Sequence, residues 1–123
     1  MHLQESGEMY LETILILSEK KNDVRSIDIC DEMGFSKPSI SRAMHLLKDG
    51  GYLDIDENGY ITLTELGREI AEKIYERHRY LTAFFVAIGV DEDTASEDAC
   101  RIEHVISDKT FFAVKEHMKA QNI

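Results

Sequence analysis

The pattern of apolar and polar positions predicts an amphipathic helix over residues 7–20. Its apolar positions recur three or four residues apart and therefore share one face; they are Tyr10, Leu11, Ile14, Leu15, Ile16 and Leu17. Ser6 is the expected N-cap, because a serine hydroxyl can accept a hydrogen bond from a free N–H group of the first turn.

Two shorter helices separated by a tight turn are predicted over residues 26–48. Ser26 and Ser36 are the expected N-caps, and Gly34 lies in the turn between the helices. The second helix tolerates Pro38 in its first turn, where a missing N–H does no harm. Two helices joined by so short a turn indicate a helix-turn-helix. Its expected core positions are Ile27, Cys30, Met33, Phe35, Ile40, Met44 and Leu47.

A β-hairpin is predicted directly after these helices. Residues 52–56 and 60–63 alternate between apolar and polar on either side of Asn58-Gly59, a favoured pair for a hairpin turn. A hairpin in this place forms the wing of a winged helix-turn-helix.

The remainder of the chain is predicted to be helical, which makes the fold class mainly α. A long helix is expected over residues 64–88 and ends at Gly89, and two more are expected over residues 91–107 and 108–120. The apolar side of the long helix contains Leu66, Ile70, Ile74, Leu81 and Phe85.

A formal net charge of −10 argues at first against a nucleic-acid binder. Affinity for DNA, however, depends on which surface is basic. Residues 36–48 contain three basic residues and no acid, whereas the acids concentrate in residues 49–57 and 91–103. The second helix of the helix-turn-helix is therefore expected to face double-stranded DNA, although a winged helix can also serve as a protein-interaction module. The candidate DNA contacts are Lys37, Ser39, Ser41, Arg42 and Lys48.

The chain shows no apolar run of the length that spans a bilayer, and residues 1–8 lack the pattern of a secretory signal. We therefore expect a cytoplasmic protein with no membrane partner. In a reducing compartment Cys30 and Cys100 are expected to be free thiols.

Three residues near the C-terminus have the spacing of a metal site. Cys100, Glu103 and His104 are offset by three and four positions, so a helix would present their thiolate, carboxylate and imidazole on one face. All three groups are recognised metal ligands. Spacing alone leaves chance open, because such a triplet arises often in helical sequences.

Three further donors lie on other predicted helices. Met9 and Glu12 are offset by three on the first helix, and His78 lies on the long helix. Each has an ordinary alternative: Met9 can pack in the core, Glu12 can be a solvated helix residue, and His78 can be a surface or interface histidine. The six donors together would form a site only if their helices pack.

Five segments carry a family resemblance. They are Glu8-Met9-Tyr10-Leu11-Glu12-Thr13-Ile14, Ser36-Lys37-Pro38-Ser39-Ile40-Ser41, Leu63-Thr64-Glu65-Leu66-Gly67, Ile88-Gly89-Val90-Asp91 and Asp98-Ala99-Cys100-Arg101-Ile102-Glu103-His104-Val105-Ile106-Ser107-Asp108. In order, they resemble segments of the DtxR/MntR family of iron- or manganese-dependent transcriptional repressors, and they extend over nearly the whole chain.

The resemblance implies a winged-helix DNA-binding domain over residues 1–66 and a helical dimerisation and metal-binding domain over residues 67–123. It also implies a homodimer that binds operator DNA, with Fe²⁺ or Mn²⁺ as co-repressor, and represses genes of metal uptake.

The resemblance further implies a hybrid metal site. The positions that match the iron-responsive branch are Met9, Cys100, Glu103 and His104. Glu12 and His78 match ligands of the manganese-responsive branch, which has acids where this chain has Met9 and Cys100. Sulfur donors are softer than carboxylates and shift preference toward Fe²⁺ and later metals. Iron is therefore the first expectation, with manganese close behind.

Two other functions compete with this interpretation. One is a winged-helix regulator that responds to redox through Cys100, or to a small ligand, rather than to metal. The other is a metal-dependent hydrolase, which would need an open coordination position and a substrate cleft. Short packed helices offer little cleft and no nucleophile motif is present, so we do not expect an enzyme.

Overall fold

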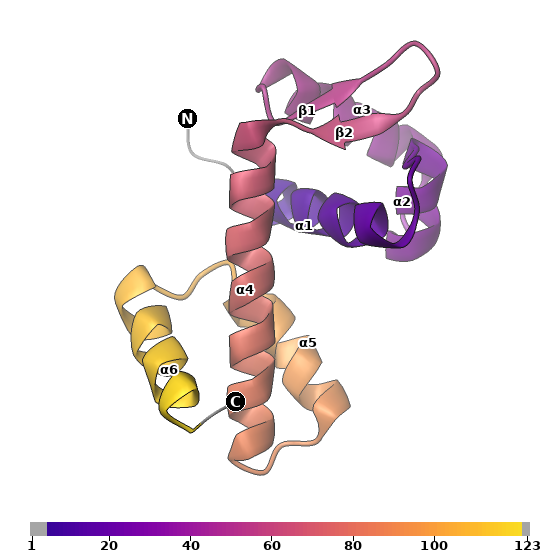
Figure 1. Cartoon of the computed structure of the whole chain (residues 1–123). Helices are drawn as coiled ribbons and strands as arrows, with labels where there is room; N and C mark the ends of the chain where they lie inside the picture. Colours follow the sequence, from indigo (N-terminus) through magenta and orange to yellow (C-terminus); the bar gives the residue numbers. More distant parts are fainter. Residues whose placement is uncertain (1–4, 122–123) are drawn as a thin grey trace. The chain divides into compact units, whose positions relative to one another are not determined.

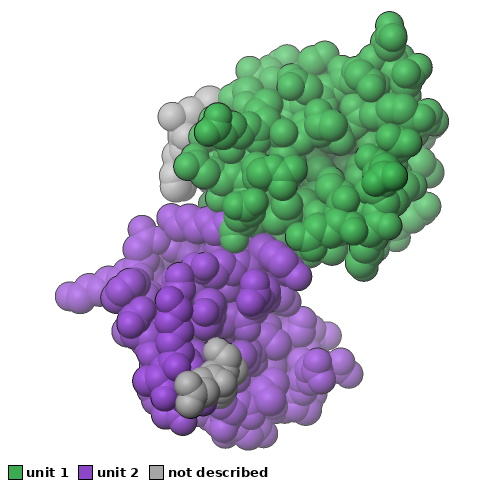
Figure 2. Space-filling view, in the orientation of Figure 1, with its two compact units in different colours: residues 1–72 green, residues 73–123 purple. Residues whose placement is uncertain are grey.

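The structure, a computed structural model, describes residues 5–121 (Figure 1). The chain forms two compact units, residues 1–72 and residues 73–123 (Figure 2). Among the described residues, none of the helices combines the length and the apolar character needed to cross a membrane.

The first unit is a winged helix-turn-helix, as predicted. Its elements are α1 (Glu5–Lys20), α2 (Ser26–Met33), α3 (Lys37–Asp49), β1 (Leu53–Ile55) and β2 (Ile61–Leu63). The two strands pair antiparallel with Leu53 opposite Leu63, and Ile61 N–H donates to the Val24 carbonyl at 2.7 Å. The hairpin is thereby tied to the segment between α1 and α2. The core includes Leu11, Ile14, Leu15, Ile29, Ile40, Met44 and Leu53.

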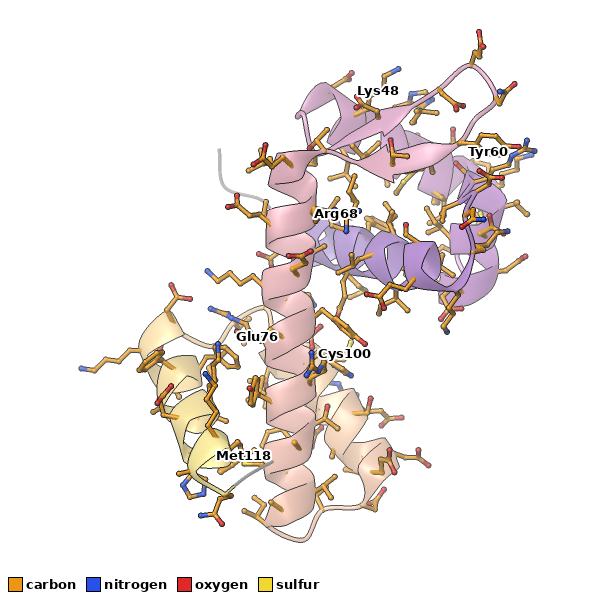
Figure 3. The ribbon with its side chains drawn as sticks, in the orientation of Figure 1. Lys48, Tyr60, Arg68, Glu76, Cys100 and Met118 are labelled. Atoms are coloured by element: carbon orange, nitrogen blue, oxygen red, sulfur yellow. The ribbon has the colours of Figure 1, made fainter. Side chains whose placement is uncertain are left out.

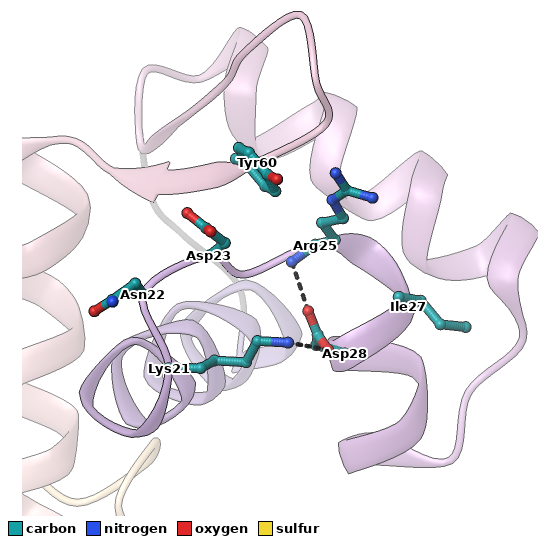
Figure 4. A pocket seen from close by; sticks show the side chains of 7 residues that line it. All are labelled: Lys21, Asn22, Asp23, Arg25, Ile27, Asp28 and Tyr60. Carbon is teal, nitrogen blue, oxygen red and sulfur yellow. Dashed lines mark hydrogen bonds and ion pairs between the residues drawn. The ribbon is translucent and has the colours of Figure 1, made fainter.

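The starts of α1 and α2 differ from the prediction. Ser6 lies inside α1, whose first turn contains the acids Glu5 and Glu8 that suit the positive end of the helix dipole. In α2 the N-cap is Arg25, so Ser26 is already helical. The carboxylate of Asp28, in the first turn, accepts the N–H of the N-cap residue Arg25 at 2.8 Å, which is the reciprocal contact of a capping box (Figure 4).

Two expected core residues of the helix-turn-helix are exposed. Ile27 is 49% exposed, because α2 buries Ile29 and Cys30, and Ile27 lies about 200° around the helix from Ile29. Phe35 is 46% exposed and packs edge-on against Tyr10, with ring centroids 6.3 Å apart. The predictions for Ile27 and Phe35 were therefore wrong.

The N-cap prediction at Ser36 is confirmed. Its hydroxyl accepts the Ser39 N–H at 3.4 Å, and Gly34 adopts a left-handed φ of 73° in the preceding turn. Only a residue without a Cβ takes that conformation without strain. The turn and the cap together set the start of α3.

The long helix α4 (Glu65–Ala87) begins against the wing. A Cβ placed on Gly67 would come within 1.9 Å of the Tyr52 carbonyl oxygen, so the helix and the wing backbone approach as closely as two chains can. Gly67, Ala71 and Ile74 form the buried face of this half of α4. Leu66 lies one residue off that face and is 46% exposed, contrary to the prediction.

The second unit consists of the C-terminal half of α4 with α5 (Glu92–Ile102) and α6 (Asp108–Ala120), which flank it (Figure 1). Asp91 and Ser107 cap the two shorter helices by accepting the N–H of the third residue along. Apolar side chains fill the space between the helices, including Leu81, Ala95, Ala99, Phe111 and Met118.

Candidate metal centre

The end of α5 positions the first candidate ligands. The predicted helix over residues 91–107 is shorter in the structure, because α5 ends at Ile102. Glu103 keeps helical backbone angles, with its N–H bonded to the Ala99 carbonyl, and His104 lies in the turn that follows. The predicted extent of this helix was therefore wrong: Cys100 lies within α5, Glu103 at its C-cap and His104 just beyond it.

Glu103 is the centre of this site in the second unit. Its side chain is fully buried, with Oε2 2.8 Å from His78 Nδ1 and Oε1 3.4 Å from His104 Nε2. The His104 side chain is 2% exposed. One buried carboxylate therefore lies between two imidazoles, one from α4 and one from the turn after α5.

The chemistry of these donors fits a divalent cation. Among the described residues Glu103 Oε1 accepts no hydrogen bond, although it is buried. A buried carboxylate oxygen without a donor is costly unless a cation compensates its charge. Imidazole nitrogens suit iron and zinc, and carboxylate oxygens suit manganese.

Ser96 orients the imidazole of His78 from the other side. Its Oγ lies 3.3 Å from His78 Nε2, while His78 Nδ1 contacts Glu103. Groups that hold the second nitrogen of a ligand histidine fix the ring and its tautomer. Ser96 therefore helps to hold the His78 imidazole in place.

Cys100 is a partly buried residue of α5 (Figure 3). Cys30, on α2, is buried, and neither cysteine forms a disulfide, as predicted. Cys100 lies one helical turn before Glu103, so its sulfur remains a candidate ligand.

Met9 and Glu12 belong to the first unit, on α1. Glu12 is 6% exposed and Met9 is partly buried. Because Glu12 is buried, the alternative of a solvated helix residue is wrong. A buried carboxylate generally needs a partner for its charge.

The candidate DNA-binding residues lie on α3. Lys37, Arg42 and Lys48 are exposed, with Lys48 at the end of the helix (Figure 3). Ser39 and Ser41 are half-buried, and the Ser36 hydroxyl donates to Ser39 Oγ at 2.9 Å. The basic side chains are thus available to DNA, whereas Ser39 is partly engaged in capping α3.

Sequence reasoning did not single out Arg77 or Leu46. Arg77 is buried beside the metal-site turn, and Leu46 is 71% exposed on α3. A lone arginine on a charged helix gives no signal of burial, while an apolar residue at a polar position of α3 would have drawn attention to Leu46.

Comparison with known proteins agrees with this fold. Residues 2–61 match the family described as "Iron dependent repressor, N-terminal DNA binding domain", and residues 64–120 match "Iron dependent repressor, metal binding and dimerisation domain". The uncharacterized HTH-type transcriptional regulator MJ0568 of Methanocaldococcus jannaschii is 33% identical over 119 residues, 95% of each chain. The HTH-type transcriptional regulator MntR of Geobacillus kaustophilus is 33% identical over 102 residues, which is 83% of this chain and 72% of that protein.

Solved structures show the same fold. A manganese-dependent transcriptional repressor in complex with manganese superimposes with a TM-score of 0.84 at 27% identity, over 92% of this chain and 52% of that chain. The manganese regulator SloR superimposes with a TM-score of 0.81 at 25% identity, over 97% of this chain and 55% of that chain. The chain thus spans about half the length of these two proteins.

The fold, the matched family descriptions and the relatives define a winged-helix transcription regulator of a metal-dependent class. The chain belongs to the iron-dependent repressor family, also called the DtxR/MntR family.

Proposed function

We propose that this protein represses genes of metal uptake by binding operator DNA as a homodimer, with Fe²⁺ or Mn²⁺ as its co-repressor. The observation that carries the proposal is the fully buried Glu103 carboxylate between His78 and His104. The winged-helix domain extends over residues 1–66 and the dimerisation and metal-binding domain over residues 67–123. Relatives named for manganese support the metal class.

The proposed ligands come from three helices and one turn. They are Met9, Glu12, His78, Cys100, Glu103 and His104. A bound divalent cation supplies a compact positive charge among buried acidic donors. The sulfur atoms of Met9 and Cys100 distinguish this donor set from a site built only of carboxylates and imidazoles. Because sulfur is the softer donor, their presence favours Fe²⁺ over Mn²⁺.

The donors belong to both units, and this division supplies the switch. Met9 and Glu12 lie on α1, which packs against α2 of the helix-turn-helix. Shared ligands make the arrangement of the two units depend on the metal, and this arrangement sets the distance between the two α3 helices of a dimer. Half-sites about one helical turn of DNA apart fit only one such distance, so the metal shifts the population toward the DNA-binding form.

Two further features belong to the proposal. Cys30 and Cys100 are not joined in a disulfide, which fits a reducing compartment and supports a cytoplasmic location. The protein acts by binding rather than by catalysis, in keeping with relatives named as transcriptional regulators.

The test is selection from a random duplex DNA library by the full-length chain with Mn²⁺ and, without oxygen, with Fe²⁺. We expect one enriched, two-fold symmetric sequence that is released by a chelator. The double variant Glu103→Ala/His104→Ala should bind that sequence equally with and without metal. Glu97→Gln, an exposed residue of α5, is the control and should respond like the wild type. A double variant that keeps the full metal response would disprove the proposal.

A further inference from the structure

Arg77 is a buried arginine of α4, one residue before His78. Its side chain is 7% exposed, and a guanidinium is seldom taken out of water unless its N–H groups are paired. Nη1 donates to the Glu103 carbonyl at 3.1 Å and to the Ile106 carbonyl at 2.9 Å. Nη2 donates to the carboxylate of Asp108.

Two of the acceptors, the carbonyls of Glu103 and Ile106, lie in the short connection from α5 to α6, and the third is the side chain of Asp108, the first residue of α6. α5 ends at Ile102 and α6 begins at Asp108, so the carbonyls in between are outside regular helix. The planar guanidinium presents its donors in a fixed fork and can hold several acceptors at once. Arg77 therefore braces the connection at its beginning and at its end.

This connection carries Glu103 and His104, two of the proposed ligands. Arg77 holds the backbone of Glu103, while His78 contacts the Glu103 carboxylate at 2.8 Å. Two successive residues of α4 thus hold the main chain and the side-chain carboxylate of the same glutamate. The guanidinium carbon also lies 5.5 Å from the centre of the Phe111 ring, which limits its movement.

We propose that Arg77 is a positioning residue of the metal centre: it fixes the turn after α5 so that Glu103 and His104 present their donors together. This role rests on the proposed function, since it concerns the same ligands. Arg77 does not touch the metal; it acts through the main chain of Glu103.

The experiment compares Arg77→Met, Arg77→Lys and the control Lys115→Met in the full-length chain. Lys115 pairs with Glu76 at 3.0 Å and joins the same two helices, α6 and α4, without touching the turn. Hydrogen exchange of residues 103–108 is measured in the metal-free protein, and affinity for Mn²⁺ is measured by calorimetry. Visible absorption of bound Co²⁺ reports the geometry of the ligands.

Arg77→Met should exchange faster over residues 103–108, bind Mn²⁺ about 10–100-fold more weakly, and change the Co²⁺ spectrum. Arg77→Lys should give values between those of Arg77→Met and the wild type in all three measurements, because an ammonium keeps the charge but lacks the planar fork of a guanidinium. Lys115→Met should lower the melting temperature and leave the other three measurements unchanged.

Unchanged exchange or unchanged Mn²⁺ affinity in Arg77→Met would overturn the inference, and so would an equal loss of affinity in Lys115→Met. If Arg77→Met does not fold, Arg77→Lys decides by the same two measurements. A wild-type chain that binds neither Mn²⁺ nor Co²⁺ would overturn the proposed function and this role with it. A wild type that binds normally beside an unaffected Arg77 variant would overturn the inference alone.

Discussion

The imidazole of His78 and the carboxylate of Glu103 lie 2.8 Å apart, between Nδ1 and Oε2, although 25 positions separate them in the sequence. The contact joins α4 to the end of α5 within the second unit. Donors held in place before a cation binds lose less conformational freedom on binding. Part of the proposed site is therefore preorganised by the fold of this unit alone.

Glu103→Gln should weaken Mn²⁺ binding by more than the roughly 10–100-fold that outer-shell partners of a metal cost. The amide has nearly the shape of the carboxylate but carries no charge, so the metal-free protein should remain folded with an unchanged or slightly higher melting temperature. Calorimetric titration and thermal unfolding of the same samples check both statements.

Glu97→Gln on the same helix provides the control, because Glu97 is exposed. It should leave metal affinity within about twofold of the wild type, as surface changes have small effects. Equal Mn²⁺ affinity in the Glu103 and Glu97 variants would exclude Glu103 as a ligand.

Cys100→Glu should shift metal preference toward Mn²⁺. A carboxylate is harder than a thiolate and suits manganese better, whereas sulfur favours the later metals. Competition of Mn²⁺ with Co²⁺ should change in favour of Mn²⁺ by about tenfold, or about 1.4 kcal/mol. Cys30→Ser, which changes a thiol of the first unit, should leave the ratio unaltered; a ratio unaltered in Cys100→Glu would remove the sulfur from the ligand set.

Arg42→Ala and Lys48→Ala should affect DNA binding in different ways. Loss of a phosphate contact at Lys48 should weaken binding to all sequences and reduce the salt slope by about 1, whereas loss of a base contact at Arg42 should relax specificity at one position. Binding measured from low to high salt on the selected sequence and on a shuffled duplex distinguishes them. Lys119→Ala, exposed on α6, is the matched control and should keep the wild-type salt dependence of DNA affinity. A Lys48 variant with the same salt dependence as the Lys119 variant would contradict the prediction.

The helices and the wing could be predicted because their signals are local. Apolar spacing placed α1, α3 and α4 within a few residues of their observed bounds, and Asn58-Gly59 marked the hairpin turn. The ends were harder to predict, because several side chains can cap one helix. At α2 the N-cap is Arg25 rather than Ser26, and the Asp28 carboxylate accepts the Arg25 N–H.

Burial was less predictable where a helix is short. Two turns of α2 bury only Ile29 and Cys30, so Ile27 faces outward although it is equally apolar. The donors of the candidate metal centre could be predicted from their residue types and their spacing in the sequence. The contribution of Arg77 was not, because its acceptors are main-chain carbonyls 26 and 29 residues further along the chain.

Gly67→Ala should lower the free energy of unfolding of the winged-helix unit by roughly 1–3 kcal/mol or more, the usual cost of overpacking. Alanine is a better helix former than glycine, so helix propensity alone predicts the opposite sign. The added Cβ would meet the Tyr52 carbonyl oxygen at 1.9 Å, however, and the backbone cannot move aside like a flexible side chain. Urea unfolding measures the difference.

Gly59→Ala gives the comparison for Gly67. Its φ of 83° strains an alanine by roughly 1–2 kcal/mol, but open space surrounds the position. Gly67→Ala should therefore be the more damaging of the two. The reverse order would mean that α4 does not approach the wing backbone so closely.

Asp28→Asn should lower the melting temperature of the winged-helix unit by a few degrees at neutral pH and by progressively less in acid. The hydrogen bond from Lys21, followed by that from the Arg25 N–H, holds the pKa of Asp28 below its ordinary value of 3.8 (Figure 4). A lowered folded-state pKa stabilises the protein fully above the unfolded-state pKa, and this contribution is lost as the pH falls through the folded-state pKa. The difference between wild type and variant should thus be constant from roughly pH 5 to 8 and shrink progressively as the pH falls below about 4, through the lowered folded-state pKa of Asp28. Asp31→Asn, an exposed position of the same helix, should unfold like the wild type throughout. A wild-type advantage that persists undiminished into strong acid would show that the charge of Asp28 does not hold the start of α2.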